Sequence, residues 1–290
     1  MEDQFIPDER SPQYWGQMTN GWKRWNDKFS KQSAEATRAI IELAQINEGM
    51  RVLDLACGSG EPSLSIARTF GPTGHVVATD IVPGMLESAE ATARSRHISN
   101  IEFRHVDAET IPFPDGTFDA VTCRFGVMFF SDPERAMREA RRVLKNRGFV
   151  ALVSWGPLKY NPRFTTTISI VEKYLQSAPK HAGSRPSEDN IFKFADHGSL
   201  SRILSEAEFI EITERHLKIP WVWDGTAKEQ FESFSDMSAP FRKMRSTLDQ
   251  DSQRRATNEI LSAIGKYYDG QGVNFTAVIN TAVGRKIDDK

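Results

Sequence analysis

Short apolar runs alternate with amphipathic stretches from about residue 50 to residue 155. The runs have the length of buried strands, and the stretches between them carry apolar residues three and four positions apart. This alternation predicts a parallel sheet covered by helices. The predicted strands are 50–55, 75–79, 101–106, 118–123 and 148–155, and the predicted helices are 62–70, 83–95 and 133–145.

Before this region, large apolar residues recur at helical spacing near the N-terminus. They are Tyr14, Met18, Trp22, Trp25 and Phe29. Such a stripe predicts an amphipathic helix that docks against a core. A lid whose aromatic side chains enclose bound ligands is a second interpretation, and the two are compatible. A further helix is predicted over 34–44.

The pattern changes after residue 155. A helix is predicted over 164–175, and a loop rich in Ser, Pro and Gly follows at 177–187. The remaining predicted elements are a helix at 200–207, a strand at 210–222, a polar helical segment at 224–268 and a last strand at 273–283.

A turn with two glycines, Gly58 and Gly60, follows the first predicted strand. Glycine lets a main chain come close to a ligand, and such a turn exposes backbone amides. A dinucleotide-binding fingerprint needs a third glycine, but Ser63 stands at that position. The carboxylates of Asp54 and Glu61 beside the turn disfavour a pyrophosphate, because like charges repel at short range. They suit a ligand that carries an ammonium or sulfonium charge.

Acidic residues also follow the next two predicted strands. Asp80 lies about 20 residues beyond the turn, where an acid can hold ribose hydroxyls. Asp107 and Glu109 follow the third strand. Open α/β sheets bind ligands at the carboxyl edge of their strands. The acids of three successive strands are therefore expected at one site.

Four segments together resemble the class I S-adenosylmethionine-dependent methyltransferases, in the branch of the ubiquinone/menaquinone-biosynthesis enzymes. The resemblance covers roughly residues 40–156 and a strand near 273–285. It implies an α/β fold with a Rossmann-like, seven-stranded, mostly parallel sheet, helices on both faces and a mainly helical cap. The segments are Asp-Leu-Ala-Cys-Gly-Ser-Gly (54–60), Val-Ala-Thr-Asp (77–80), Asp-Ala-Glu-Thr-Ile-Pro-Phe-Pro-Asp-Gly-Thr-Phe-Asp-Ala-Val (107–121) and Arg-Val-Leu-Lys-Asn-Arg-Gly (142–148).

The resemblance also implies a division of the chain, in which two inserts form the cap over the carboxyl edge. The divisions are an N-terminal helical lid (1–33), a cofactor-binding core (34–156), a cap insert (157–197), a core helix and strand (198–223), a second helical insert (224–270) and a final core strand (271–290).

S-adenosylmethionine is the cofactor that the resemblance implies. Asp54 would face the methionine ammonium through a hydrogen bond or water, Asp80 the ribose hydroxyls and Asp107 the adenine amino group. A turn-stabilising role is the alternative for Asp54. For Arg124, a structural ion pair with Glu109 or Asp107 is favoured over a substrate role. The residues assigned to the cofactor are Asp54, Ala56, Gly58, Gly60, Asp80, Ile81, Met85, Asp107, Ala108, Glu109, Arg124 and Phe125.

The acceptor pocket is expected beneath the cap. The quinone enzymes commonly carry a polar segment after the fourth strand, whereas residues 126–130 here read Gly-Val-Met-Phe-Phe. This difference predicts an apolar wall and counts against a quinone acceptor. No catalytic residue is assigned, because transfer from a sulfonium depends on positioning and water exclusion. The residues assigned to the pocket are Tyr14, Trp22, Met128, Phe129, Trp155 and His181.

Composition narrows the classes of protein. The net charge of −2 disfavours a general nucleic-acid binder. The two cysteines, Cys57 and Cys123, lack metal-site spacing, so no metal is expected. They also exclude a disulfide framework, which indicates a reducing, cytoplasmic location. No apolar run reaches the length of a membrane span, about 18 residues. The expected partner is a small-molecule acceptor, and a homodimer is left open.

These observations predict a methyltransferase that acts on a small, largely apolar or aromatic metabolite. Oxygen and carbon acceptors are favoured equally, and nitrogen less. One alternative is C-methylation of a prenylated quinone precursor. Another is a non-catalytic S-adenosylmethionine-binding regulator or partner subunit. A nicotinamide-dependent oxidoreductase is disfavoured by the missing third glycine and by Asp54.

Overall fold

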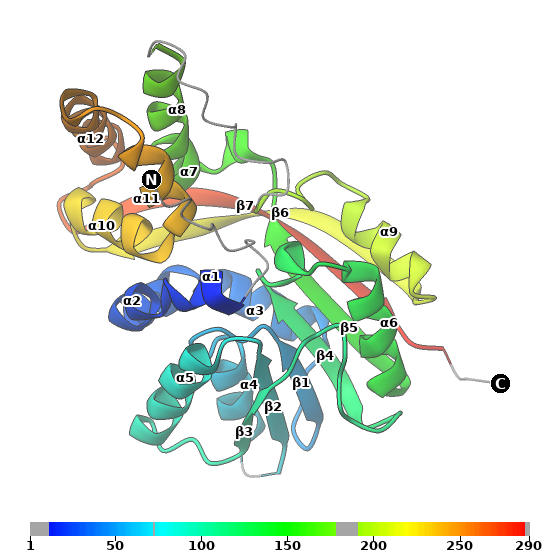
Figure 1. The fold of residues 1–290 in the computed structure, drawn as a ribbon. Coiled ribbons are helices and arrows are strands. Elements are labelled where there is room, and N and C mark those ends of the chain that lie inside the picture. The colour runs from blue at the N-terminus through cyan, green and yellow to red at the C-terminus, as the bar shows by residue number, and fades with distance from the viewer. Residues whose placement is uncertain (1–11, 72, 178–190, 288–290) are drawn as a thin grey trace.

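A seven-stranded sheet lies at the centre of the molecule (Figure 1). The computed structural model describes residues 12–71, 73–177 and 191–287. The strand order is β3-β2-β1-β4-β5-β7-β6, and β7 alone runs antiparallel to its neighbours. The predicted Rossmann-like, mostly parallel sheet is confirmed. The strands are β1 (Arg51–Leu55), β2 (His75–Asp80), β3 (Ile101–His105), β4 (Phe118–Arg124), β5 (Leu144–Trp155), β6 (Ile210–Asp224) and β7 (Gly272–Arg285).

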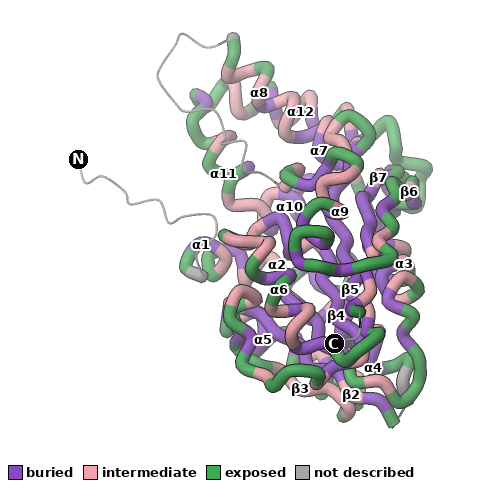
Figure 2. The backbone as a smooth tube through the Cα atoms, turned by 90° about the vertical axis from the view of Figure 1, so that its right-hand side faces the viewer, coloured by how far each residue is buried: buried purple, intermediate pink, exposed green. Residues whose placement is uncertain are grey.

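Helices cover the sheet, which explains why its central strands are continuous apolar runs. α3 packs across β4 to β7, α6 packs on β5, and α9 packs on β6 and β7. Figure 2 shows the strands as a largely buried layer, with exposed helix turns outside it. These helices are α3 (Ala34–Leu43), α4 (Ser63–Phe70), α5 (Pro83–Ser95), α6 (Pro133–Val143) and α9 (Ser199–Glu206).

A long antiparallel arm joins the sheet to a group of peripheral helices. β6 and β7 pair from Ile210 with Arg285 to Asp224 with Gly272. The far end of this arm carries α10, α11 and α12, and α12 packs against α8. These elements form the upper left of Figure 1. The peripheral helices are α7 (Pro162–Thr165), α8 (Ile168–Ser177), α10 (Ala227–Met237), α11 (Ala239–Ser246) and α12 (Gln250–Gly265).

The N-terminal helices lie between the sheet and the peripheral group. The segment with the aromatic stripe is divided into two helices, α1 (Pro12–Gly16) and α2 (Thr19–Gln32). The first helix ends at Gly16, and glycine favours helix ends. α2 packs against β6, α5 and α10. Its Trp25 and Phe29 rings lie 5.5 Å and 5.9 Å from those of Trp223 and Trp221. The expected docking of this stripe is therefore confirmed.

Several predicted elements differ from the structure in their boundaries. The helix predicted to reach residue 145 ends at Val143, because Leu144 already pairs with Phe118 as the first residue of β5. The helix predicted over 164–175 is divided into α7 and α8, and the 224–268 segment into three helices. Ser238 causes one of these breaks, because its hydroxyl caps the start of α11. Within the described ranges, no helix is long and apolar enough to cross a bilayer.

Candidate functional site

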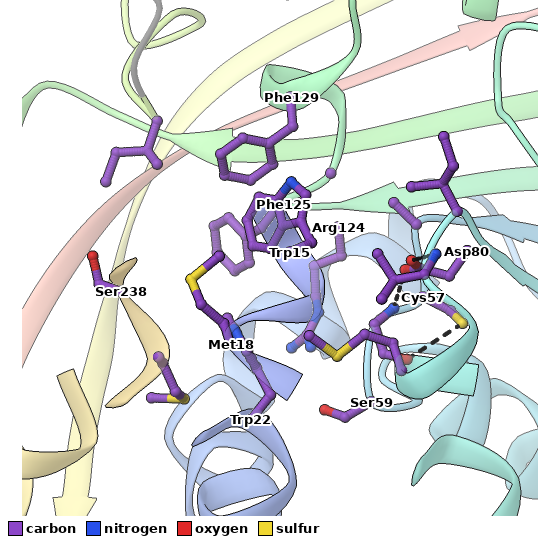
Figure 3. Close-up of a pocket in the computed structure, with 18 of the residues that line it drawn as sticks. Trp15, Met18, Trp22, Cys57, Ser59, Asp80, Arg124, Phe125, Phe129 and Ser238 are labelled. Carbon is purple, nitrogen blue, oxygen red and sulfur yellow. Dashed lines mark hydrogen bonds between the residues drawn. The ribbon is translucent and has the colours of Figure 1, made fainter. Parts of the chain in front are cut away.

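A cavity of about 320 Å³ opens where the carboxyl ends of β1 to β5 meet the N-terminal and peripheral helices. Its two walls differ in chemistry. We call the wall formed by Ala56, Gly58, Asp80 and Asp107 the strand-end side. The opposite wall is the cap side, formed by Trp22, Phe29, Trp155, Arg163, Phe164 and Phe234. In Figure 3, Asp80 lies beside the turn at Cys57, and the Trp15, Phe125 and Phe129 rings gather across the cavity.

Asp80 holds the strand-end side together through hydrogen bonds from main-chain amides. One carboxylate oxygen accepts from the amide of Gly58 at 2.8 Å, and the other from the amide of Val82 at 2.9 Å. Burial raises the pKa of the Asp80 carboxyl above its usual value, although these amide hydrogen bonds act in the opposite direction. Each oxygen of an ionised carboxylate has about two acceptor positions. Asp80 therefore holds the turn after β1 and can still accept from a ligand in the cavity.

Asp54 lies beneath the turn and does not line the cavity. Its carboxylate accepts from the hydroxyls of Ser63 and Thr122, which ties β1 to α4 and β4. The side chain is completely buried, and burial raises the pKa of Asp54 to about 6. Asp54 is therefore not placed for a direct hydrogen bond to a ligand in the cavity, and a contact with a ligand ammonium through water stays a prediction. Its hydrogen bonds to Ser63 and Thr122 are those of the turn-stabilising alternative.

Two residues with side chains adopt the left-handed conformation at the strand ends. Ala56 has φ 54° after β1, and Phe125 has φ 58° after β4. Non-glycine residues rarely adopt this conformation, and such strain is often found at functional sites. The turns meet at Gly126, where an added Cβ would lie 2.5 Å from the Cβ of Ala56. This close packing directs the Phe125 ring onto Trp155, with ring centroids 4.4 Å apart.

Arg124 makes neither of the ion pairs that the sequence suggested. Its guanidinium donates to the hydroxyls of Ser33 and Thr37 at 2.7 Å and 3.0 Å, and to the carbonyl oxygen of Glu61 at 3.0 Å. Glu109 instead accepts from the amide of Asp132. Burial lowers the pKa of Arg124. Arg124 therefore anchors α3 to the turn after β1, at the inner end of the cavity.

Aromatic rings dominate the cap side. Trp155 meets Phe164 edge to face at 4.9 Å, and Phe164 meets Phe234 at 5.7 Å. Trp22 packs against Phe29 at 5.0 Å. Edge-to-face contacts of this kind stabilise a wall of rings and leave its surface apolar. The cap side can therefore enclose an apolar or aromatic molecule and exclude water from it.

The cavity gathers most of the residues that the sequence assigned. Asp54, Gly60 and Met128 do not line it, and Met128 belongs to the core. His181 lies outside the described residues. Within the described part of the chain, no cluster of three or more His, Cys, Asp or Glu residues could hold a metal. The assigned residues that line the cavity are Tyr14, Trp22, Ala56, Gly58, Asp80, Ile81, Met85, Asp107, Ala108, Glu109, Arg124, Phe125, Phe129 and Trp155.

Several lining residues were missed by the sequence analysis. Asn26 had a weak signal as a polar residue on the α2 stripe. It accepts from the Ser59 hydroxyl at 2.6 Å and so links α2 to the turn. The cap residues had no motif, because peripheral helices bring them together from distant segments. The missed residues of this kind are Arg163, Phe164, Ile168, Ile191, Phe234, Met237, Ser238 and Pro240.

Comparison with known proteins supports one family. Residues 53–152 match the family model described as a methyltransferase domain. The chain is 32% identical over 178 residues to the ubiquinone/menaquinone biosynthesis C-methyltransferase UbiE of Cronobacter sakazakii, a match that covers 59% of this chain and 71% of the relative. It is 40% identical over 119 residues to the UbiE protein of Pseudomonas putida, with 41% of this chain and 46% of that relative covered. The chain thus spans about half the length of the second relative.

Among solved structures, the [4+2]-cyclase SpnF superposes with a TM-score of 0.59, and the match covers 98% of each chain. The sequence identity is 19%, so this likeness concerns the fold alone. A fold by itself does not determine the reaction.

Proposed function

Because the chain belongs to the class I S-adenosylmethionine-dependent methyltransferases, in the branch of the ubiquinone/menaquinone-biosynthesis enzymes, we propose that it methylates a small, largely apolar or aromatic metabolite beneath the cap. The observation that carries this proposal is the continuity of the cavity. One space joins the acids of the strand-end side to the aromatic rings of the cap side. A methyl donor and an apolar acceptor could therefore meet there.

The strand-end side fits S-adenosylmethionine. The Asp80 carboxylate retains acceptor positions for ribose hydroxyls, and Asp107 lies at the exposed rim, where it could accept from the adenine amino group. Ile81, Met85 and Val106 supply an apolar lining between these acids for the adenine ring. When bound, the cofactor supplies an electrophilic methyl group on a sulfonium.

The work left to this chain is positioning and water exclusion. A reaction at a preorganised pair of atoms gains rate from its fixed geometry, and an apolar enclosure removes competing water. The Phe125 ring, stacked on Trp155, lies where the two sides of the cavity meet. We therefore assign Phe125 and Trp155 to positioning the acceptor. No side chain is assigned as a general base.

The acceptor atom is proposed to be oxygen or carbon, with nitrogen less favoured. A second candidate is C-methylation of a prenylated quinone precursor, which the names of the relatives favour. However, the matching family model covers residues 53–152 and so leaves out both inserts. Phe129 and Phe130 also present apolar rather than polar side chains after β4. These points favour a wider class of aromatic acceptors.

Calorimetric titration with S-adenosylmethionine and S-adenosylhomocysteine tests the cofactor part of the proposal. Asp80→Ala should weaken binding by about 1–3 kcal/mol, because ligand donors lose a charged acceptor. Asp251→Asn, an exposed carboxylate on α12, is the matched control and should bind like the wild type. Unchanged affinity in Asp80→Ala would remove Asp80 from the site. No binding by the wild type would refute the proposed function.

A labelled-methyl screen tests the acceptor part. The screen should include phenols, naphthols, quinols and amines, each with and without the protein. We expect transfer to an aromatic oxygen or carbon. Transfer confined to prenylated quinols would favour the second candidate. Cofactor binding without transfer to any compound would instead favour the non-catalytic alternative.

A further inference from the structure

Arg163 is a buried cation in the wall of the acceptor region. Arg163 belongs to α7, is 7% exposed and lines the cavity. Its Nη1 donates a hydrogen bond to the side-chain oxygen of Gln32 at 2.6 Å. Within the described part of the chain, no carboxylate forms an ion pair with it. A guanidinium carries five N–H donors, so most of the donors of Arg163 remain for other partners.

The surroundings of Arg163 hold it in place without neutralising it. Its guanidinium carbon lies 5.4 Å from the centroid of the Phe29 ring and 5.3 Å from that of Phe234. The Gln32 amide that receives its bond donates in turn to the side-chain oxygen of Gln230 at 3.0 Å. Gln32 and Gln230 are themselves 2% and 1% exposed. The cation is thus oriented by two rings and a buried amide chain.

This arrangement costs folding free energy. Burial lowers the pKa of Arg163 to about 9, and no neighbouring acid opposes that effect. Burying a charge without an oppositely charged partner destabilises the folded state even after the protein relaxes. Cation–π contacts recover only part of that cost. A structural role in cap packing would be served as well by an uncharged side chain, so the charge calls for another explanation.

The two cavity arginines occupy different environments. Arg124 donates from both Nη atoms to two hydroxyls and a main-chain carbonyl beside the turn after β1, and its buried Nε has no hydrogen-bond partner among the described residues. Arg163 is placed among rings on the cap side, where the acceptor is expected. If the methionine carboxylate of the cofactor needs a cation, Arg124 is the one beside the glycine turn.

We propose that Arg163 binds a carboxylate of the methyl acceptor, so that the substrate class is aromatic or apolar carboxylic acids. This inference rests on the proposed function and narrows its substrate class. The planar fork of a guanidinium matches both oxygens of a carboxylate, and the flanking Phe29 and Phe234 rings would hold the apolar body. Phe125 and Trp155 would then set the distance from this anchor to the transferred methyl group.

The test uses the full chain saturated with S-adenosylhomocysteine. Carboxylic acids are compared with neutral amides of the same shape. Benzoate, cinnamate and 2-naphthoate are titrated calorimetrically beside benzamide, cinnamamide and 2-naphthamide. We expect the wild type to bind at least one of the acids at least about tenfold more tightly than the corresponding amide, as for a hydrogen bond to a charged group. In Arg163→Gln the preference should fall to about twofold or less, and Arg163→Lys should be intermediate because it keeps the charge and loses the fork. Arg254→Gln, an exposed change on α12, should behave as the wild type.

Separate outcomes would overturn the proposal. A wild type that binds S-adenosylhomocysteine but shows no preference for acids, including no binding of either series, refutes the carboxylate anchor alone. A preference that survives in Arg163→Gln has the same consequence. Absence of S-adenosylhomocysteine binding by the wild type would instead refute the proposed function.

The cofactor's own carboxylate is distinguished by a second pair of probes. 5′-Methylthioadenosine lacks the amino acid part of S-adenosylhomocysteine. If Arg163→Gln weakens binding of S-adenosylhomocysteine but leaves that of 5′-methylthioadenosine unchanged, Arg163 serves the cofactor and the proposal is wrong. We expect both affinities to stay within about twofold of the wild type, because no hydrogen bond to either ligand is lost.

Thermal denaturation without ligand gives a readout that a structural arginine would not share. Arg163→Met should melt at the same temperature as the wild type or higher, because it removes an uncompensated buried charge. A melting temperature lower by several degrees in both Arg163→Met and Arg163→Gln would assign Arg163 to cap packing and contradict the proposal.

Discussion

The two sides of the cavity differ in how their polar groups are satisfied. On the strand-end side, Asp80 accepts from main-chain amides, and the Asp54 carboxylate beneath it accepts from two hydroxyls. On the cap side, the described part of the chain offers Arg163 no acid partner and the buried indole nitrogen of Trp22 no hydrogen-bond partner. The carboxylates of the strand-end side have donors from the protein, although the buried Nε of Arg124 nearby lacks an acceptor among the described residues, whereas the cap side has donors left for a ligand.

This difference follows from how each side is built. The strand-end side comes from short turns between consecutive elements, so local hydrogen bonds can fix it. The cap side joins α2, α7 and α10, whose side chains meet only after the whole chain has folded. Unpaired buried donors cost stability, and natural proteins keep such costs mostly at functional sites. Specificity for the acceptor is therefore expected on the cap side.

The largest expected effect is the change of unfolding free energy with pH that the buried Asp54 carboxyl causes. Its folded pKa of about 6 lies above the usual 3.8, so the folded state binds the proton more tightly. The stabilisation is then full at pH values below about 4 and is lost as the pH rises through about 6. About two pH units correspond to about 3 kcal/mol. Urea unfolding of the wild type between pH 4 and 7 should show this fall.

The Asp54→Asn variant supplies the control for this pH dependence. Its amide cannot ionise but can keep bonds to Ser63 and Thr122, since hydroxyls can donate or accept. The difference in unfolding free energy between wild type and variant should therefore change with pH by the stability that the wild type loses, about 3 kcal/mol. A difference that stays constant from pH 4 to 7 would contradict the raised pKa.

The strand-end side could largely be predicted from the sequence because its signals are local. The strand, the glycine turn and the acids at the ends of β2 and β3 lie within about 60 residues, and each strand end carries its own marker. Asp54 shows the limit of this reasoning. A carboxylate four residues before a glycine suggests a ligand contact, but only the packing of Ser63 and Thr122 shows that it points into the protein.

The cap side could not be predicted in the same way. Arg163 follows a proline in a segment without a motif, and its neighbours Gln32 and Gln230 are about 130 residues before it and 70 after it. Nothing in the spacing of such residues indicates that they meet. The aromatic stripe on α2 did indicate buried faces, because helical periodicity is a local signal. The partner of each face depends on tertiary packing.

The second expected effect concerns the contact between the turns after β1 and β4. In Gly126→Ala the new Cβ would meet the Cβ of Ala56 at 2.5 Å and the sulfur of Cys123 at 2.9 Å. Overpacking of this kind typically costs about 1–3 kcal/mol of unfolding free energy. Affinity for S-adenosylhomocysteine should fall as well, because the turn at Ala56 lines the cavity. Urea unfolding and calorimetry measure the two effects.

Gly265→Ala is the matched control for this substitution. Gly265 ends α12, and a Cβ there meets nothing within 4 Å. The change should leave stability equal or slightly higher, by up to about 1 kcal/mol, because alanine favours the helix. If Gly126→Ala were as stable and bound cofactor as well as Gly265→Ala, close packing between the turns after β1 and β4 would not be what fixes the strand-end side.

The smallest expected effect separates two neighbouring indoles of α2. Trp22 lines the cavity with its buried nitrogen lacking a partner in the described part of the chain, whereas Trp25 donates to the Asp236 carboxylate at 2.8 Å. Trp22→Phe keeps an aromatic ring and removes the donor, so ligand binding or turnover should fall by about 1 kcal/mol, roughly fivefold, with little change in stability. Trp25→Phe should do the reverse, because the Asp236 carboxylate loses its indole donor while the cavity is unaltered. Calorimetry, methyl-transfer rates and thermal unfolding of both variants give the comparison. Loss of stability in Trp22→Phe with normal specific activity would mean that the α2 aromatics only dock the helix, and that the free donors of the cap side are not reserved for a ligand.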